Sequence, residues 1–261
     1  MHPMINIAIK AARKSGKIIL NGLNNLDNIT VQEKSKNNFV SNVDKSAERA
    51  ILEIIRLSYP DHGIIAEESG TIAGNEFTWV IDPLDGTTNF LHGFPHFCTS
   101  IGILQNGVPT HGVVYDPLRD ELFTATLGEG AMLNQRRLRL KDSVHLDGGL
   151  IGTGFPYAVP DQIEKYLQMF REICPRAAGI RRAGSAALDL CYIAAGRLDG
   201  FWELGLSPWD IAAGAVIVKE AGGKLSDFRG GTDFLTTGNI VAGSPKVHNE
   251  LQPIIRDSIG R

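Results

Sequence analysis

The spacing of apolar residues predicts two amphipathic helices in the first sixty residues. Over residues 1–20 the apolar side chains fall mostly on one helical face with lysines opposite, and Asn21-Gly22 is expected to end the helix. That face consists of Ile5, Ala8, Ile9, Ala12 and Ile19. A second, stronger pattern ends at Tyr59-Pro60, because proline cannot continue a helix. Its apolar residues are Ala47, Ala50, Ile51, Ile54 and Ile55.

After the second helix the pattern becomes that of strands. Residues 63–66 and 78–81 are short apolar runs of the buried type, and Pro83 and Gly86 are expected to end the second run at Asp82. Asn106-Gly107 is a hairpin signal between later apolar runs. We therefore predict an antiparallel meander, followed by a strand whose basic side chains are exposed. The meander strands cover 99–104, 108–115 and 121–126, and the basic strand covers 136–141.

The second half of the chain alternates strands with helices. Predicted strands cover 150–153, 198–204, 224–227 and 239–242, and predicted helices start near Asp161 and cover 185–195, 211–221 and 245–259. This change of rhythm divides the chain into an N-terminal α+β half, residues 1–145, and a C-terminal α/β half, residues 146–261. With 261 residues and 43% apolar content, the chain can form a full core.

The segment D-P-L-D-G-T-T, which follows the strand at 78–81, combines acidic and turn-forming residues. Asp82 and Asp85 lie three residues apart around a proline of fixed φ, so their carboxylates and the Leu84 carbonyl can converge on one point. Such hard oxygen donors suit Mg²⁺ or Mn²⁺. If Gly86 and Thr87 open a short helix, its N–H groups form a cradle for phosphate. Taken singly, Asp-Pro and Asp-Gly are ordinary turn signals.

Two earlier acidic positions also allow both a structural and a chemical interpretation. Asn42 or Asp44 can cap the second helix, and Glu67-Glu68 before Ser-Gly has the composition of a solvated loop. Glu67 nevertheless follows a short buried strand directly, as Asp82 does. The residues by themselves leave both interpretations open for Asp44 and Glu67.

A second acidic motif, S-P-W-D at residues 207–210, leads directly into an apolar helix. Ser207 can cap this helix, with proline at the first helical position and Asp210 completing a capping box. A carboxylate at a helix N-terminus stays ionised in the positive end of the helix dipole. Asp210 can therefore cap the helix and bind a metal at the same time.

Taken together, D-P-x-D-G-T and the downstream P-W-D closely resemble the metal-binding signatures of the inositol monophosphatase family. The resemblance covers essentially the whole chain, and R-R-x-G-S-A-A-L-D-L is similar to bacterial members. It implies a layered α-β-α-β-α sandwich of the sugar-phosphatase type. It also implies hydrolysis of inositol 1-phosphate by metal-activated water, with two to three Mg²⁺ ions or Mn²⁺, inhibition by lithium, and a homodimer.

The resemblance also assigns roles to individual residues. Thr87, oriented by Asp44, would position the attacking water, Glu67 would serve catalysis through its metal, and Asp82 would bridge two ions. The implied metal ligands are Glu67, Asp82, Leu84, Asp85 and Asp210. The implied substrate contacts are Gly86, Thr87, Gly184, Ser185, Ala186, Glu203 and Asp210, with Glu203 binding inositol hydroxyls. A basic residue of the early polar loop could correspond to either Lys34 or Lys36.

Composition narrows the compartment and the partners. The formal net charge of −3, from 29 acidic and 26 basic side chains, argues against broad electrostatic binding to nucleic acid but not against a local basic patch. Three cysteines without C-x-x-C spacing favour a reducing compartment over a disulfide framework or a zinc site. Neither a signal-peptide core nor a membrane-spanning run is found, so we expect a cytoplasmic protein without a membrane partner.

Two alternative functions remain at this point. Hydrolases of fructose 1,6-bisphosphate or of 3′-phosphoadenosine nucleotides share the metal chemistry. In the other alternative, the fold serves as a regulator that binds RNA or the transcription machinery. The basic residues at 136–141 and Arg181-Arg182 are compatible with a regulator of this kind. The presence of every ligand carboxylate favours catalysis instead.

Overall fold

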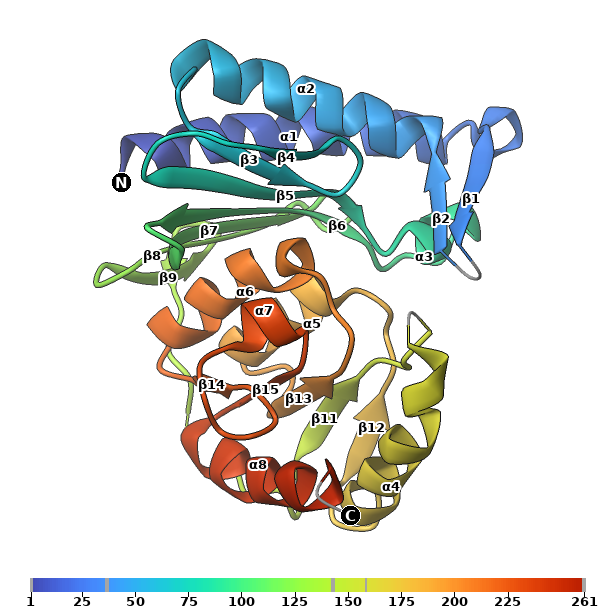
Figure 1. The fold of residues 1–261 in the computed structure, drawn as a ribbon, viewed down its shortest axis with the longest axis vertical. Helices are drawn as coiled ribbons and strands as arrows, with labels where there is room; N and C mark the ends of the chain where they lie inside the picture. The colour runs from blue at the N-terminus through green and yellow to red at the C-terminus, as the bar shows by residue number, and fades with distance from the viewer. Residues whose placement is uncertain (1, 36–37, 142–143, 158, 260–261) are drawn as a thin grey trace.

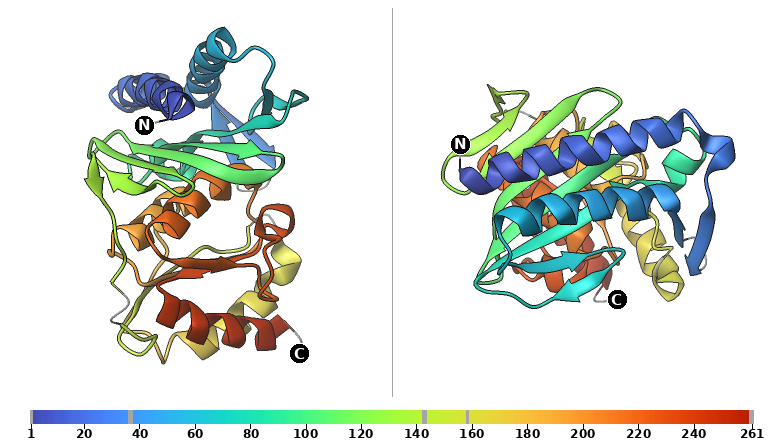
Figure 2. Two further views of the ribbon diagram at one scale, coloured as in Figure 1. Left: turned by 90° about the vertical axis from the view of Figure 1, so that its left-hand side faces the viewer. Right: turned by 90° about the horizontal axis from the view of Figure 1, so that it is seen from above.

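The computed structural model describes residues 2–35, 38–141, 144–157 and 159–259, and it shows five stacked layers (Figure 1). Two helices cover an eight-stranded sheet, two more lie between that sheet and a five-stranded sheet, and two close the far face (Figures 1 and 2). From the first helical layer to the last, these helices are α1 (Pro3–Leu23), α2 (Asn42–Ser58), α5 (Ala186–Ala194), α6 (Pro208–Glu220), α4 (Ile163–Ile173) and α8 (Pro245–Ile259). The predicted α-β-α-β-α sandwich is confirmed.

The larger sheet has the order β10-β9-β8-β7-β6-β5-β3-β4. Among the described pairs of this sheet only β3–β5 is parallel. The antiparallel meander predicted over residues 99–126 corresponds to β6, β7 and β8, whereas β4 was not predicted. The strands of this sheet are β3 (Gly63–Ala66), β4 (Gly70–Ile72), β5 (Phe77–Asp85), β6 (Cys98–Gln105), β7 (Val108–Asp116), β8 (Glu121–Thr126), β9 (Gly130–Leu133) and β10 (Arg136–Arg137). The strand predicted over 136–141 is shorter than expected and covers only Arg136–Arg137. Leu138 still donates its N–H to the Ala131 carbonyl of β9, whereas Leu140 donates to the carbonyl of Ala221, which follows α6.

Strand β5 corrects the prediction that Pro83 ends the strand at Asp82. The strand continues to Asp85, and its register against β6 shifts between Asp82, opposite Ser100, and Asp85, opposite Cys98. Such a bulge accommodates a proline because it leaves one residue outside the ladder of hydrogen bonds. The Pro83 carbonyl accepts hydrogen bonds from the hydroxyls of Ser15 and Thr99 instead. The two aspartates are therefore held at the carboxyl end of a paired strand rather than in a free turn.

The smaller sheet has the order β12-β11-β13-β15-β14 and mixes parallel with antiparallel pairs. Its strands are β11 (Leu150–Thr153), β12 (Gly179–Arg181), β13 (Gly200–Glu203), β14 (Lys224–Ser226) and β15 (Ile240–Gly243). The sequence pattern predicted four of these five strands and missed β12. The division of the chain into halves at residues 145 and 146 stays a prediction.

Helix α6 packs directly on the larger sheet through two glycines of β6 and β7. A side chain at Gly102 would meet Ala212, and one at Gly112 would meet the Ala213 carbonyl at 2.4 Å. The missing side chains let the helix backbone approach the strands closely. The Ser100 hydroxyl also donates to the Trp209 carbonyl at 3.1 Å. The first turn of α6 is thereby fixed beside the end of β5.

Short elements complete the chain. They are η1 (Leu26–Asn28), the hairpin of β1 (Val31–Ser35) and β2 (Asn38–Ser41), α3 (Thr87–Leu91), η2 (Pro160–Gln162) and α7 (Phe234–Thr237). The prediction for Lys36 falls outside the described residues, as does the side chain of Lys34. Within the described ranges, none of the helices has both the length and the apolar character needed to cross a membrane.

Candidate active site

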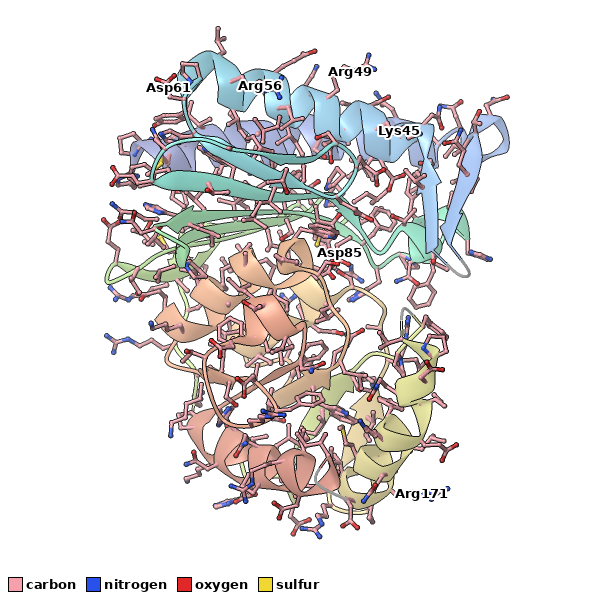
Figure 3. The ribbon with its side chains drawn as sticks, viewed as in Figure 1. Lys45, Arg49, Arg56, Asp61, Asp85 and Arg171 are labelled. Atoms are coloured by element: carbon pink, nitrogen blue, oxygen red, sulfur yellow. The ribbon has the colours of Figure 1, made fainter. Side chains whose placement is uncertain are left out.

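Three carboxylates converge where β5 and α6 meet. Asp82, Asp85 and Asp210 each offer an oxygen atom, and these three atoms lie within 4.8 Å of one another. Figure 3 labels Asp85 between the larger sheet and the middle helices. Strand β3 runs parallel to β5, with Ala66 opposite Ile81. Glu67, the residue after β3, therefore lies at the same end of the strands as Asp82. The tertiary structure thus brings together acidic residues that are 143 positions apart in the sequence.

These carboxylates line a cavity of about 290 Å³. Of the residues assigned from the sequence, the cavity wall contains Glu67, Asp82, Leu84, Asp85, Gly86, Thr87, Gly184, Glu203 and Asp210. Asp44, Ser185 and Ala186 lie behind this wall, where each is buried. Their effect on a bound molecule must therefore pass through the residues in front of them.

Hydrogen bonds anchor one oxygen of each clustered carboxylate. Asp82 accepts from the Leu84 N–H at 2.9 Å, and Asp210 accepts from the Ser207 N–H at 2.8 Å. Asp85 Oδ2 accepts from the Ser185 hydroxyl at 2.6 Å and from the N–H of residue 187 at 2.8 Å. Outer partners of this kind orient carboxylates that bind metals.

Burial and mutual repulsion raise the pKa of these acids. The pKa of Asp82 lies well above its ordinary value because of burial first, and then because of the charges of Glu67, Asp85 and Asp210. Burial raises the pKa of Asp85 to about 6, against the opposing effect of the Ser185 hydrogen bond. Burial, followed by the charge of Asp85, raises the pKa of Asp210. Like charges held this closely call for a cation, and an all-oxygen donor set fits Mg²⁺ or Mn²⁺.

Asp44 connects a helix cap to the cavity. The N-cap of α2 is Ser41, rather than Asn42 or Asp44 as predicted, and Asp44 completes a capping box by accepting from the Ser41 N–H at 2.9 Å. The other Asp44 oxygen accepts from the Thr87 hydroxyl at 2.8 Å. Thr87 also bonds the Leu84 carbonyl at 2.9 Å. Asp44 therefore contributes to the helix cap and also contacts Thr87 of the cavity, the two roles that the sequence left as alternatives.

Gly86 makes the tight connection between β5 and α3. Its φ is +91°, a left-handed conformation that favours glycine, and a side chain there would lie 2.9 Å from the His96 carbonyl. Because of this turn, α3 begins at Thr87 beside the carboxylates, as the sequence predicted. The N–H groups of its first turn have no helical partner, which is the basis of the predicted phosphate cradle.

Asn89 is a structural member of the site that the sequence analysis missed. Its amide nitrogen donates to the carbonyls of His96 at 2.8 Å and Ala183 at 2.9 Å, and lies 3.4 Å from that of Gly184. It thus joins the metal loop to the segment before α5. Its place inside D-G-T-T-N-F was the only signal for it, because an asparagine in a short helix has no distinctive spacing.

Glu203 lies half-buried on the cavity wall at the end of β13. Burial raises its pKa to about 8, the charge of Asp189 adds to this rise, and the charge of Arg182 opposes it. Any side chain at Gly154 would overlap the Glu203 carboxylate. The neighbouring glycine therefore leaves the space that this acid occupies.

An aromatic and basic wall faces the acidic cluster, and the sequence analysis did not assign it to the site. The guanidinium of Arg182 lies 5.6 Å from the ring centre of Phe155 and 5.3 Å from that of Tyr157. All three residues line the cavity, and Arg182 is the one cationic side chain among its described lining residues. Cation–π contacts of this length hold the guanidinium in place.

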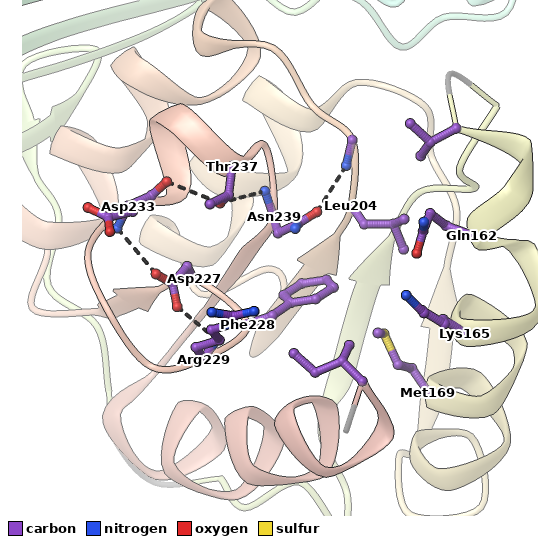
Figure 4. A pocket seen from close by; sticks show the side chains of 13 residues that line it. Gln162, Lys165, Met169, Leu204, Asp227, Phe228, Arg229, Asp233, Thr237 and Asn239 are labelled. Atoms are coloured by element: carbon purple, nitrogen blue, oxygen red, sulfur yellow. Dashed lines mark hydrogen bonds between the residues drawn. The ribbon is translucent and has the colours of Figure 1, made fainter. Parts of the chain in front are cut away.

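A second cavity, of about 600 Å³, lies between α4, α8 and the loop after β14 (Figure 4). It shares Leu204 and Gly205 with the smaller cavity. Its charged lining consists of Lys165, Asp227, Arg229 and Asp233, and Asp227 is occupied by backbone N–H groups. We place the active site in the smaller cavity, because only there do several carboxylates of the described chain converge.

The sequence model of the inositol monophosphatase family matches residues 1–259. The chain belongs to the inositol monophosphatase family. Curated relatives include "Nus factor SuhB" of Pasteurella multocida, which is 51% identical over 98% of both chains. "Nus factor SuhB" of Escherichia coli (strain K12) is also 51% identical, over 99% of this chain and 98% of its own.

Solved structures in this family share the fold closely. The extragenic suppressor protein suhB of Bartonella henselae has a TM-score of 0.94 and 40% identity, covering 98% of this chain and 99% of its own. The inositol monophosphatase of Anabaena sp. PCC 7120 has a TM-score of 0.87 and 40% identity, covering 97% and 95%. Membership of the inositol monophosphatase family supports a phosphatase that uses a divalent metal.

Proposed function

We propose that this protein is a Mg²⁺-dependent phosphomonoesterase that hydrolyses inositol 1-phosphate to inositol and phosphate. The observation that carries the proposal is the convergence of Asp82, Asp85 and Asp210 in a cavity that also contains Thr87 and Glu203. Uncatalysed hydrolysis of phosphate monoesters is among the slowest of reactions, and metal ions can stabilise the charge that it develops. A cluster of mutually repelling carboxylates is the expected counterpart of such ions.

The residues that would hold the ions are Glu67, Asp82, Asp85, Asp210 and the carbonyl of Leu84. Bound Mg²⁺ would acidify a water molecule and stabilise the departing alkoxide. The protein contributes the orientation of these ligands, since each clustered aspartate has one oxygen anchored by a hydrogen bond. It also contributes the β5 bulge, which keeps both Asp82 and Asp85 on the wall of the cavity.

Thr87 is the residue that we propose to orient the attacking water. Its hydroxyl hydrogen is directed to Asp44 and the Leu84 carbonyl, so its oxygen is left with lone pairs to accept a hydrogen bond. A water that donates to this oxygen has its own lone pair free for attack. Asp44 is then a positioning residue, because it acts through Thr87 and lies behind the wall.

Glu203 and the facing wall would select the leaving group. Glu203 is half-buried on the cavity wall, and the hydroxyls of a cyclic polyol can form hydrogen bonds with its carboxyl group. Phe155 and Tyr157 line the same cavity as this acid. These features support inositol as the alcohol, whereas sugar bisphosphates or 3′-phosphonucleotides remain the alternatives within the same chemistry.

An assay of the purified protein on three substrates tests this proposal directly. Inositol 1-phosphate, fructose 1,6-bisphosphate and a 3′-phosphoadenosine nucleotide would be compared with Mg²⁺ and with chelator. We expect the highest kcat/KM for inositol 1-phosphate, and no turnover in chelator or in Asp82→Asn. Full activity in chelator would refute metal dependence, and a preference for either other substrate would replace inositol.

A second function is favoured by the names of the curated relatives. Several of them, at about half identity over nearly the whole chain, are called Nus factor SuhB. We therefore propose that this protein also associates with the transcription machinery. The hydrolysis-deficient Asp82→Asn variant should retain that association in a pull-down of RNA polymerase from its own host. Absence of RNA polymerase from the pull-down at physiological salt would contradict it.

Three further properties stay proposals, the first two from the family resemblance and the third from the sequence composition. We expect a homodimer, inhibition by lithium, and a cytoplasmic location. Light scattering that shows a monomer at micromolar concentration would contradict the dimer, and unchanged turnover in millimolar lithium would contradict the inhibition. Cell fractionation tests the location.

A further inference from the structure

The outer helical layer concentrates positive charge in a chain that is acidic as a whole. Helices α1 and α2 contain seven lysines and arginines but only three acidic residues. Two of those acids, Asp44 and Glu48, are buried, so Glu53 alone is exposed. The helices have a formal charge of +4, which leaves −7 for the rest of the chain with its total of −3.

Six of these cations form two rows on the outer face. In α1, Lys10, Lys14 and Lys17 follow the four- and three-residue steps of one helical stripe, opposite the buried positions. In α2, the row consists of Lys45, Arg49 and Arg56, and all six are exposed. Figure 3 shows the α2 row along the outer edge of the molecule, and Figure 2 shows the two helices side by side.

These cations are not neutralised by neighbouring acids. Within the described ranges, none of the six has an ion-pair partner within 4.0 Å; Arg13, the seventh cation, pairs with Asp120. Lys45 has a neutral contact, to the Gln32 amide at 2.8 Å. A groove along α2 is lined by the α2 row itself and by three acidic residues, Glu48, Glu53 and Glu68.

The composition of this face indicates phosphate groups rather than a protein surface or exposed bases. Neither Pro3–Leu23 nor Asn42–Ser58 contains an aromatic residue. Protein interfaces are enriched in aromatic side chains and depleted in lysine, and proteins that bind single strands stack bases on aromatic rings. A duplex, by contrast, is held mainly through contacts to its phosphates.

We propose that the outer face of α1 and α2 binds double-stranded RNA through its phosphate backbone. Packed helices have axes about 8–10 Å apart, so the two rows can follow two phosphate strands across a narrow groove. The major groove of an RNA duplex is deep and narrow, and such duplexes are recognised by shape and phosphate contacts. The proposal does not depend on hydrolysis, because the cations lie across the larger sheet from α6 and Asp210.

Fluorescence anisotropy with a labelled RNA duplex of about twenty base pairs tests the assignment. The triple variant Lys10→Glu, Lys14→Glu, Lys17→Glu should weaken binding at least tenfold at about 0.1 M salt, and should reduce the slope of log K against log salt by about two to three. The pair Arg49→Glu, Arg56→Glu should also weaken binding. Both variants should keep the wild-type rate of phosphate-ester hydrolysis, which separates this test from that of the active site.

A matched control distinguishes this face from net charge. The variant Arg136→Glu, Arg139→Glu, Lys141→Glu has the same change in charge at another exposed basic cluster. It should retain binding within about threefold. Equal loss in both triple variants, or no binding by the wild type at physiological salt, would overturn the proposal. Equal or tighter binding of a DNA duplex, of oligouridylate or of polyglutamate would overturn the choice of RNA duplex.

Discussion

Asp44 and Thr87 are 43 positions apart in the sequence and are joined by a hydrogen bond of 2.8 Å. Asp44→Asn should lower kcat at least a hundredfold, because an amide can turn its nitrogen to the hydroxyl and release the orientation of Thr87. The same change should cost about 0.5–2 kcal/mol of stability through the capping box. Steady-state kinetics and denaturant unfolding measure the two effects separately.

The control for Asp44 is its capping partner. Ser41→Ala removes the cap hydroxyl and its bond to Asp44 Oδ2, but the Ser41 N–H still donates to that oxygen and Thr87 still donates to Oδ1. It should therefore lower stability by a similar amount with much less effect on kcat. If Ser41→Ala abolished turnover as Asp44→Asn does, the cap rather than the bond to Thr87 would control activity. Thr87→Ser should retain activity that Thr87→Val loses.

Asn89 should control how the metal loop and the substrate wall fit together. Asn89→Asp replaces a donor by a carboxylate that faces the carbonyls of residues 96, 183 and 184, so repulsion should separate the two segments. We expect kcat/KM to fall at least tenfold, with KM rising more than kcat falls. Asn89→Ala, which creates no repulsion, should have a smaller effect. A larger loss for alanine than for aspartate would contradict this reading.

Glu203 should affect substrate preference more than the chemistry at phosphorus. Because the pKa of Glu203 is raised to about 8, we expect Glu203→Gln to weaken kcat/KM for inositol 1-phosphate by about 1–3 kcal/mol above pH 8, where the carboxylate is charged, and by much less at pH 6. A small aryl phosphate lacks the hydroxyls and should be affected much less, whereas Asp210→Asn should impair both substrates equally. Equal loss on both substrates with Glu203→Gln would place this acid in the metal shell or the fold.

The carboxylate cluster should make the metal-free protein sensitive to pH. The pKa of Asp85 is raised from 3.8 to about 6, so its contribution to stability is fully present below pH 3.8 and is lost as the pH rises through 6. In chelator, the free energy of unfolding of the wild type should fall by about 2–3 kcal/mol over this pH window, relative to that of Asp85→Asn. Magnesium should restore this stability at pH 7.5 and add little at pH 4.

The measurement for this prediction is the difference between wild type and Asp85→Asn in denaturant unfolding at each pH. Taking the difference cancels groups that titrate alike in both proteins, whereas Asp82 and Asp210, whose pKa the Asp85 charge raises, contribute to it as parts of the same cluster. A difference that stays constant from pH 4 to 7, or equal stabilisation of both proteins by magnesium, would show that Asp85 is not an unfavourably buried acid of the metal site.

Local patterns in the sequence were sufficient for much of this protein. The repeats of Ala47 and Ile51 on one helical face, and the Asn106-Gly107 turn between apolar runs, depend on interactions within one or two elements. The metal loop is similar, since Asp82, Asp85 and Gly86 are close in sequence. For such features, backbone geometry and side-chain period already restrict the structure, so helix, hairpin and candidate ligands could be predicted.

Contacts between distant segments were decided only by the tertiary structure. The β5 bulge requires the partner β6 and hydroxyls from Ser15 and Thr99, so Pro83 alone suggested the wrong strand end. Ser185 is buried and donates its hydroxyl to Asp85, and Asn89 finds two of its acceptors 94 and 95 residues away. These bonds depend on how α5 and α6 pack against the larger sheet. No local period encodes that packing, because it is determined by the complementary shapes of surfaces that meet only in the folded chain.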